Sequence, residues 1–269
     1  MNTTEHNRTQ QNTESLRHDD HKLDFSQVKR YKDFVALAKD KSLSKYEKIG
    51  FPDSFREGKE GFIFEDILKK LPNLNGQHKT VLDIGPGCSD LPHMIINKCR
   101  ENAHTLGLLD SPEMLSFLPN DTFIIKILGL YPENQDEVIK NFQSGVDVII
   151  CYSVLHHIYE DTSIYKFLDS CLEILKPEGE MLIGDIPNAS KRKRFFASNT
   201  GKVFHRKFTG NNDDPKVQFN VLEKDKIDDS ILHSITLRAQ YAGFDAYVVP
   251  QAPELPMSNR RDDIIIRKP

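Results

Sequence analysis

Short apolar segments alternate with amphipathic segments of helical spacing along most of the chain. Five apolar segments are rich in Ile, Val and Leu and too short for buried helices, so we predict strands over residues 80–84, 104–109, 123–128, 146–152 and 180–186. Between the last two, apolar residues recur at the spacing of one buried helix face, at Ile164, Phe167, Leu168, Cys171, Leu172 and Leu175. This alternation is typical of a doubly wound parallel sheet.

The C-terminal residues are predicted to complete the sheet. Residues 227–242 have helical spacing, a turn follows at Gly243, and residues 246–249 and 264–267 have the pattern of strands. Two closing strands joined by a loop are compatible with an antiparallel pair at the sheet edge. We therefore predict an α/β, Rossmann-like fold with a seven-stranded, mostly parallel sheet and an antiparallel last strand.

The N-terminal residues have a different pattern. Residues 1–22 are almost entirely polar and cannot offset the entropy of ordering, so we expect a disordered tail. Apolar residues then recur at helical spacing, which predicts a helical N-terminal cover over residues 23–76. Its aromatic segment 51–58 could cover a ligand or merely join two helices, and we favour the joint. The main domain would span residues 77–269, with an insertion at about 187–226 where the alternation breaks.

Composition excludes several classes of protein. With 38% hydrophobic and 28% charged residues, the 269-residue chain can bury a core. Its net charge of -4 gives no global positive field toward nucleic acid or anionic membranes, and no apolar run approaches the roughly 18 residues of a spanning helix. The four cysteines lack ligand spacing and no secretion signal is visible, so we expect a cytoplasmic protein without a structural metal.

The first predicted strand runs into a glycine turn, Gly85-Pro86-Gly87. Glycines there let a ligand approach the backbone at the carboxyl end of the strand. A dinucleotide site would have a third glycine where this chain has Asp90, and a carboxylate at a helix start repels a diphosphate. Asp83 adds a second acid before the turn. Both acids favour a cationic ligand such as S-adenosylmethionine, which has a sulfonium and an ammonium group.

A third acid, Asp110, ends the second predicted strand, 23 residues after Gly87. A carboxylate at this position can accept hydrogen bonds from both hydroxyls of a ribose. Nicotinamide and adenosylmethionine cofactors both contain a ribose. Asp110 therefore predicts a nucleoside cofactor without choosing between the two.

Four short segments of the sequence have the pattern of known motifs and follow one another along the chain. They are Val-Leu-Asp-Ile-Gly-Pro-Gly at 81–87, Leu-Leu-Asp-Ser-Pro-Glu-Met-Leu at 108–115, Asp-Val-Ile-Ile-Cys-Tyr-Ser-Val-Leu-His-His-Ile at 147–158 and Leu-Lys-Pro-Glu-Gly at 175–179. Together they resemble the motifs of class I S-adenosylmethionine-dependent methyltransferases. The resemblance covers residues 79–186 and resumes at residue 227.

This resemblance implies cofactor-binding roles for the matching residues. Asp83, Gly85, Pro86 and Gly87 would shape the methionine end of the site, Asp110 would hold the ribose with Ser111 beside it, and Cys151 and Tyr152 would lie near the transferable methyl. The family often has an acid after the third strand that binds the adenine amine, whereas this chain has Leu-Gly-Leu-Tyr-Pro at 128–132. Adenine would then rely on backbone groups and on apolar cover such as Leu130.

Three residues at the ends of strands four and five are candidate catalytic bases, because a hydroxyl or ammonium nucleophile must lose a proton. His156 and His157 directly follow the fourth predicted strand, and Asp185 lies near the end of the fifth. A histidine has a pKa suited to this task. The alternative is structural, with the histidines beginning a helix and bonding to backbone.

The insertion is strongly basic. Residues 186–224 contain nine Lys or Arg against three acids. This pattern is either a solvated basic face or a groove for an anionic acceptor, because guanidinium groups bind phosphate and carboxylate. The candidate acceptor-binding residues are Arg192, Arg194, His205 and Arg206.

These observations predict S-adenosylmethionine-dependent methyl transfer to the oxygen or nitrogen of a small anionic acceptor, such as a sugar phosphate, a nucleotide-linked sugar or an acidic metabolite. One alternative is RNA methylation, which the net acidity of the chain disfavours; another is a non-catalytic protein that binds S-adenosylmethionine. An NAD-dependent oxidoreductase is disfavoured by Asp90 in place of the third glycine. No membrane partner is expected.

Overall fold

The computed structural model describes residues 24–221 and 223–269, so the predicted tail lies outside the described residues. Its centre is a seven-stranded sheet of order β3-β2-β1-β4-β5-β7-β6, in which β7 is antiparallel to both neighbours. The strands are β1 (Thr80–Ile84), β2 (Thr105–Asp110), β3 (Ile124–Leu128), β4 (Val146–Tyr152), β5 (Leu175–Pro187), β6 (Asp245–Pro250) and β7 (Arg261–Arg267). The predicted fold class is confirmed.

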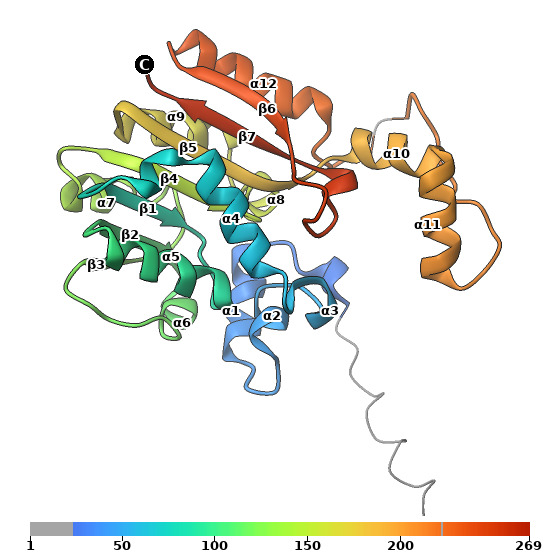
Figure 1. Ribbon diagram of the computed structural model, residues 1–269, viewed down its shortest axis with the longest axis horizontal. Coiled ribbons are helices and arrows are strands. Elements are labelled where there is room, and N and C mark those ends of the chain that lie inside the picture. Colours follow the sequence, from blue (N-terminus) through green and yellow to red (C-terminus); the bar gives the residue numbers. More distant parts are fainter. Residues whose placement is uncertain (1–23, 222) are drawn as a thin grey trace, which may run out of the picture.

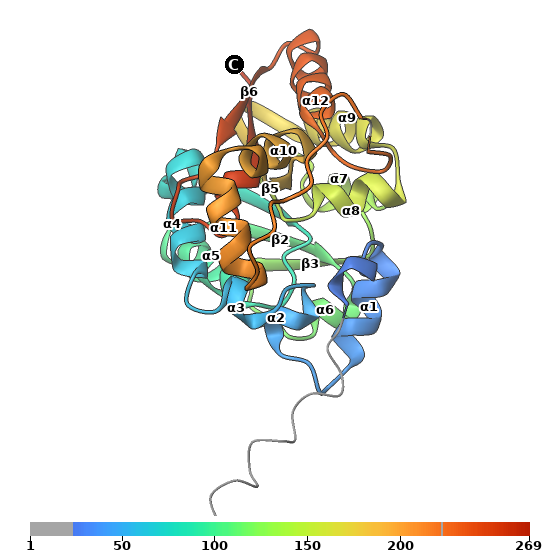
Figure 2. The same cartoon turned by 90° about the vertical axis from the view of Figure 1, so that its right-hand side faces the viewer.

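Helices cover both faces of the sheet (Figures 1 and 2). One face packs against α4 (Glu60–Lys70) and α5 (Asp90–Glu101), and the other against α7 (Gln135–Asn141), α8 (Leu155–Asp161), α9 (Ile164–Ile174) and α12 (Asp229–Tyr241). The apolar stripe predicted for α9 is buried, with Phe167 and Cys171 fully enclosed. The helix ends at Ile174 because Leu175 already pairs with Val146 as the first residue of β5.

The N-terminal segment forms short helices beside the carboxyl ends of the strands (Figure 1). They are η1 (Phe25–Gln27), α1 (Tyr31–Lys39), α2 (Lys45–Lys48) and α3 (Asp53–Arg56), with η2 (Pro72–Asn75) following α4. The Tyr31 N–H donates to the Asp161 carboxylate on α8 at 2.7 Å, and Lys45 binds Asp90 on α5 at 2.5 Å. These contacts hold the segment against the helices that follow β1 and β4.

The basic insertion contains two helices that project from the body of the molecule, α10 (Ala189–Ala197) and α11 (Asn199–Thr209) (Figure 1). Two further short elements lie at loop ends, α6 (Pro112–Leu115) after β2 and η3 (Ser258–Arg260) before β7. Within the described ranges, no helix has the length and apolar character required to cross a bilayer.

The strand register brings the loops after β1, β2 and β4 together at the carboxyl ends of these strands. β1 pairs with β2 on one side and with β4 on the other, and all three strands are parallel. The chain runs from β1 to β2 and β3 on one side and then crosses to β4 on the other side, and this change of direction opens a crevice at the carboxyl ends of β1 and β4. The glycine turn, Asp110 and Ser153 follow β1, β2 and β4 and meet at this crevice.

Candidate active site

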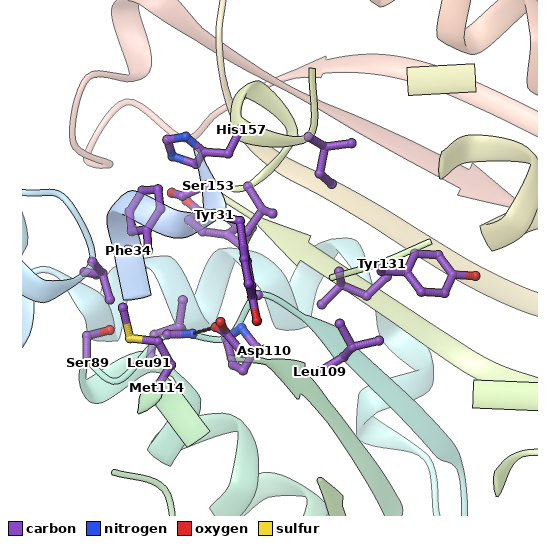
Figure 3. Close-up of a pocket in the computed structure, with 18 of the residues that line it drawn as sticks. Tyr31, Phe34, Ser89, Leu91, Leu109, Asp110, Met114, Tyr131, Ser153 and His157 are labelled. Atoms are coloured by element: carbon purple, nitrogen blue, oxygen red, sulfur yellow. Dashed lines mark hydrogen bonds between the residues drawn. The ribbon is translucent and has the colours of Figure 1, made fainter. Parts of the chain in front are cut away.

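A cavity lies at the carboxyl ends of β1, β2 and β4, roofed by the N-terminal helices; we call it the first cavity. Figure 3 shows Tyr31 and Phe34 of the roof together with Asp110 and Ser153 at the strand ends. Residues of the strand ends and of the roof form the wall: Tyr31, Phe34, Ile49, Phe51, Arg56, Glu60, Ile84, Gly85, Pro86, Gly87, Ser89, Leu91, Leu109, Asp110, Met114, Gly129, Leu130, Tyr131, Tyr152, Ser153, Val154, His157, Ile158 and Asp161.

The glycine turn forms the floor of the first cavity. Gly85 and Gly87 have φ values of 71° and 67°, a region that favours glycine. A Cβ at Gly85 would lie 2.7 Å from Val154 Cγ2, and one at Gly87 would lie 2.6 Å from Ile49 Cγ2. Backbone conformation and lack of space therefore both require glycine at these positions.

Asp110 faces into the first cavity at the end of β2 (Figure 3). Its carboxylate accepts hydrogen bonds from the backbone N–H of Gly87 at 3.1 Å and of Ser111 at 2.6 Å. Burial raises the pKa of Asp110 to about 6, so the group is ionised at neutral pH. A fixed carboxylate of this kind suits the ribose role expected for it.

The remaining predicted cofactor residues divide into two groups. Pro86, Leu130 and Tyr152 line the first cavity, whereas Asp83, Ser111 and Cys151 are buried outside its wall. Burial, and secondarily the Asp110 charge, raises the pKa of Asp83 to about 8. Ser111 instead accepts a hydrogen bond from Met114 N–H and caps α6. These three residues therefore lie behind the wall of the first cavity and would not contact a ligand in it directly.

Two charged residues that the sequence analysis did not identify, Arg56 and Glu60, line the first cavity, and each has a buried polar atom without a hydrogen-bond partner among the described residues. Arg56 Nε and Glu60 Oε1 are both buried and lack a hydrogen-bond partner within residues 24–221 and 223–269. Glu60 Oε2 accepts a hydrogen bond from Leu91 N–H at 2.7 Å, in the first turn of α5. A free cationic donor and a free anionic acceptor in one cavity fit the carboxylate and ammonium of an amino acid, as at the methionine end of S-adenosylmethionine.

Segment 51–58 was expected merely to join two helices. This prediction was wrong, because part of the segment lies in the wall of the first cavity. Phe51 and Arg56 line the first cavity, and the Arg56 guanidinium lies 4.2 Å from the centre of the Phe51 ring. The signal available in the sequence was an arginine and a glutamate four residues apart, next to an aromatic loop. Helical spacing alone could not show which way these residues face.

The acid at the start of α5 does not act as the sequence suggested. Asp90 is outside the wall of the first cavity, and its side chain is 43% exposed and bound to Lys45 and Tyr46. Glu60 takes over the expected electrostatic role, because its carboxylate occupies the helix end where a phosphate would bind. The turn therefore still disfavours a diphosphate, through a residue from the N-terminal helices.

Asp185 is a fixed partner of two arginines. Its Oδ2 lies 2.9 Å from Arg56 Nη2 and 2.8 Å from Arg261 Nη1, and the Ser153 hydroxyl also donates to it. The carboxylate is 4% exposed and lies outside the wall of the first cavity. Asp185 thus lacks the free access that a catalytic base needs; it positions Arg56 instead.

His157 lies where the first cavity meets a second cavity. The second cavity is bounded by the N-terminal segment, the start of α10, the loop at 223–227 and the start of β7, and it shares Phe34, Ile49, Phe51 and His157 with the first. The His157 ring packs edge-on against Phe34, with 4.5 Å between the ring centres (Figure 3). His156 lines the second cavity only, and its Nδ1 is buried without a partner among the described residues.

The protonation of His157 follows from one hydrogen bond. Its Nδ1 lies 2.9 Å from the Lys29 carbonyl oxygen, which can only accept, so Nδ1 bears the hydrogen and Nε2 keeps a free lone pair. Burial lowers the pKa of His157 to about 4, which keeps the ring neutral at pH 7.

The predicted residues of the insertion are not gathered in one place. Arg192 lines the second cavity. Arg194 binds Asp229 at 2.5 Å, Arg206 binds Asp214 at 2.6 Å, and neither lines the first or second cavity. His205 lines a separate hollow together with Arg192 and Phe196. The structure thus brings only Arg192 next to the candidate active site.

The fold of this chain is the one found in a known class of proteins, the S-adenosylmethionine-dependent methyltransferases. Solved methyltransferase structures match it. The plantazolicin methyltransferase BpumL in complex with SAH has a TM-score of 0.53 and 14% identity, covering 90% of this chain and 96% of that one. The N-methyltransferase NodS from Bradyrhizobium japonicum WM9, in complex with S-adenosyl-l-homocysteine, has a TM-score of 0.50 and 12% identity, with 89% and 98% covered.

A third match is the CurJ carbon methyltransferase, with a TM-score of 0.50 and 15% identity, covering 89% of this chain and 65% of that one. No family model and no curated protein matches the sequence. Identities this low establish a shared fold. The expected resemblance to the class I fold is therefore confirmed, while substrate and chemistry have to be argued from the site.

Proposed function

We propose that this protein transfers a methyl group from S-adenosylmethionine, bound in the first cavity, to an oxygen or nitrogen of a small anionic acceptor in the second cavity. The observation that supports this most directly is the pair of free buried atoms, Arg56 Nε and Glu60 Oε1, in the cavity that also contains Asp110. The three groups match the carboxylate, the ammonium and the ribose of one ligand. S-adenosylmethionine supplies a methyl group on a positively charged sulfur.

The chain's own residues would mainly align the reactants. Asp185 holds Arg56 and the Gly87 amide holds Asp110, so the groups that would bind the cofactor are fixed beforehand. Such alignment of two bound reactants can remove about 7 to 11 kcal/mol from a reaction barrier. The apolar residues Phe34, Ile49 and Phe51, common to both cavities, would exclude water from the path of the methyl group.

His157 is the residue we assign as general base. It is neutral, its Nε2 lone pair is free, and it lies at the junction where the acceptor atom would meet the methyl group. Its Nε2 would take the proton from a hydroxyl or ammonium nucleophile, although the pKa lowered to about 4 by burial makes it a weaker base than the sequence led us to expect of a histidine. The Lys29 carbonyl fixes the ring for this task, as an orienting group does for other catalytic histidines.

Isotope labelling tests the proposal. The protein is incubated with methyl-labelled S-adenosylmethionine and a cell metabolite extract, and labelled products are sought by mass spectrometry, while calorimetry measures cofactor binding. His157→Gln should lower the turnover of the labelled product at least tenfold and change cofactor affinity by less than about threefold. Binding of cofactor without any labelled product would favour the non-catalytic alternative. Label in RNA, falling steeply with salt, would favour RNA methylation.

A further inference from the structure

Three chain segments with basic residues are joined at the start of α10. The Asn188 N–H donates to the Arg260 carbonyl at 3.1 Å, and the Ala189 N–H donates to the Ile227 carbonyl at 2.9 Å. These backbone bonds fix the first turn of α10, the residues before β7 and the loop at 223–227 relative to one another. As a result Arg192, Arg260 and Lys226, which are distant in sequence, lie in the wall of the second cavity.

The side chains of this trio lack the carboxylate partners that the neighbouring cations have. Among residues 24–221 and 223–269, Arg192 and Lys226 form no ion pair, and the side-chain hydrogen bond of Arg260 goes to the neutral Asn259 at 3.1 Å. The adjacent Lys193 and Arg194, by contrast, bind Glu223 and Asp229. The wall also contains three carboxylates, Glu160, Glu223 and Asp225, of which Glu223 is paired with Lys193, so the positive charge of the trio is partly but not directly balanced.

Two of these guanidinium groups lie over aromatic rings. Arg192 is 5.6 Å from the ring centre of Phe196, and Arg260 is 5.7 Å from that of Phe204. Such stacking orients the face of a guanidinium and leaves its N–H edge available for an anion. Burial and the charges of Arg261 and Arg192 lower the pKa of Arg260, as expected for cations that share one wall.

We propose that Arg192, Arg260 and Lys226 bind a phosphate group of the acceptor, at a distance from the atom that receives the methyl group. This inference rests on the proposed function and assigns the acceptor's chemical class. A carboxylate can be matched bidentately by one guanidinium, whereas a phosphate dianion has three terminal oxygens and can neutralise two. The acceptor would therefore be a phosphorylated small molecule held in the second cavity while its nucleophile lies at His157.

The test measures anion binding to the full chain by NMR titration with inorganic phosphate and, separately, with acetate. Arg192→Gln/Arg260→Gln should weaken phosphate binding at least tenfold, and Arg192→Gln alone should weaken it by about threefold or more. The matched control Arg100→Gln/Arg238→Gln removes the same charge at exposed sites paired with Asp121 and Asp169. This control should change phosphate binding by less than twofold. The wild-type chain should bind phosphate more tightly than acetate.

Each outcome has a distinct meaning. Unchanged phosphate binding in Arg192→Gln/Arg260→Gln, an equal loss in the control, or equal affinity for acetate would overturn the phosphate assignment. Calorimetry with S-adenosylmethionine on the same four proteins separates this from the proposed function. If the cofactor binds all of them alike while phosphate binding fails the test, only the acceptor class is wrong. If the cofactor binds none of them, the proposed function itself fails.

Discussion

The first and second cavities share four wall residues but are built in different ways. The first lies at the ends of three paired strands, and its charged groups are buried and fixed by Asp185 and by backbone amides. The second is formed by loops and by the basic insertion, with exposed cations such as Arg192 and Lys226 in its wall. The proposed cofactor site is therefore built mainly from strand ends of the sheet, whereas the proposed acceptor site is built mainly from loops and the basic insertion.

Asp185 links the two cavities, and its replacement should have the largest effect. Arg56 faces the first cavity and Arg261 the second, and both bind this carboxylate. Asp185→Asn leaves two buried guanidinium groups without their anion, so we expect the free energy of unfolding to fall by about 3 to 5 kcal/mol. Urea denaturation followed by circular dichroism measures this.

The control for that experiment is Asp169→Asn, which breaks the exposed pair between Asp169 and Arg238. Exposed ion pairs contribute about 0 to 1 kcal/mol, so the free energy of unfolding should hardly change. Similar losses in the two variants would mean that Asp185 does not hold the cavities together.

The glycine turn tests how closely the N-terminal segment fits the first cavity. Gly87 and Gly58 have similar positive φ values, 67° and 69°, but an added Cβ would meet Ile49 at Gly87 and nothing within 4 Å at Gly58. Gly58→Ala should lose about 1 to 2 kcal/mol of stability from backbone strain. Gly87→Ala should lose about 1 to 3 kcal/mol more from overpacking.

Cofactor affinity should separate these glycine variants further. Ile49 lines both cavities, so its displacement in Gly87→Ala should weaken S-adenosylmethionine binding at least tenfold, whereas Gly58→Ala should leave the affinity within twofold. Calorimetry measures both. Equal affinities in the two variants would show that the turn does not contact the ligand.

Asp110 gives the first cavity a pH dependence. In the proposed complex the ribose hydroxyls would donate to the ionised carboxylate, whose pKa burial raises to about 6. Affinity for S-adenosylmethionine should therefore fall as the pH drops through 6, by about tenfold between pH 7 and pH 5. Asp83 titrates higher, since burial raises its pKa to about 8, and would not mimic this change.

Asp110→Asn is the matching variant. It should weaken cofactor binding at least tenfold at pH 7, because the charge-assisted bonds to the ribose are lost. It should also remove the change in affinity between pH 5 and pH 7, as measured by calorimetry in buffers of equal ionic strength. A pH dependence that persists in Asp110→Asn would assign the titration to another group.

The stability change caused by Asp110 has the opposite sign to its effect on binding. Because its folded-state pKa of about 6 lies above the unfolded value, the native state favours the protonated carboxyl. This contribution to stability is present below about pH 4 and is lost as the pH rises to 6. Stability and cofactor affinity should therefore move in opposite directions between pH 4 and pH 6.

The parts of the molecule that could be predicted from the sequence are those that depend on local pattern, and the parts that could not are those that depend on contacts between distant segments. The strands, the glycine turn and Asp110 were predictable because each depends on local pattern and on where a parallel strand ends. Arg56, Glu60 and Arg260 were not, because their roles depend on which distant segments pack together. Asp90 was misjudged for the same reason, since its exposure and its contact with Lys45 are properties of the folded chain.

The smallest expected effects come from comparing Asp90, the first residue of α5, with Glu60 of α4, whose carboxylate binds the Leu91 N–H in the first turn of α5. Glu60 faces the first cavity with Oε1 free, whereas Asp90 lies outside it. Glu60→Gln removes the charge but keeps an acceptor oxygen, so S-adenosylmethionine affinity should fall by about three- to tenfold. Asp90→Asn should change it by less than twofold, because the Asp90 charge is exposed and already paired with Lys45. Titration of both variants at low and moderate salt measures these differences. A larger loss of S-adenosylmethionine affinity in Asp90→Asn than in Glu60→Gln would assign the electrostatic role to Asp90 instead of Glu60.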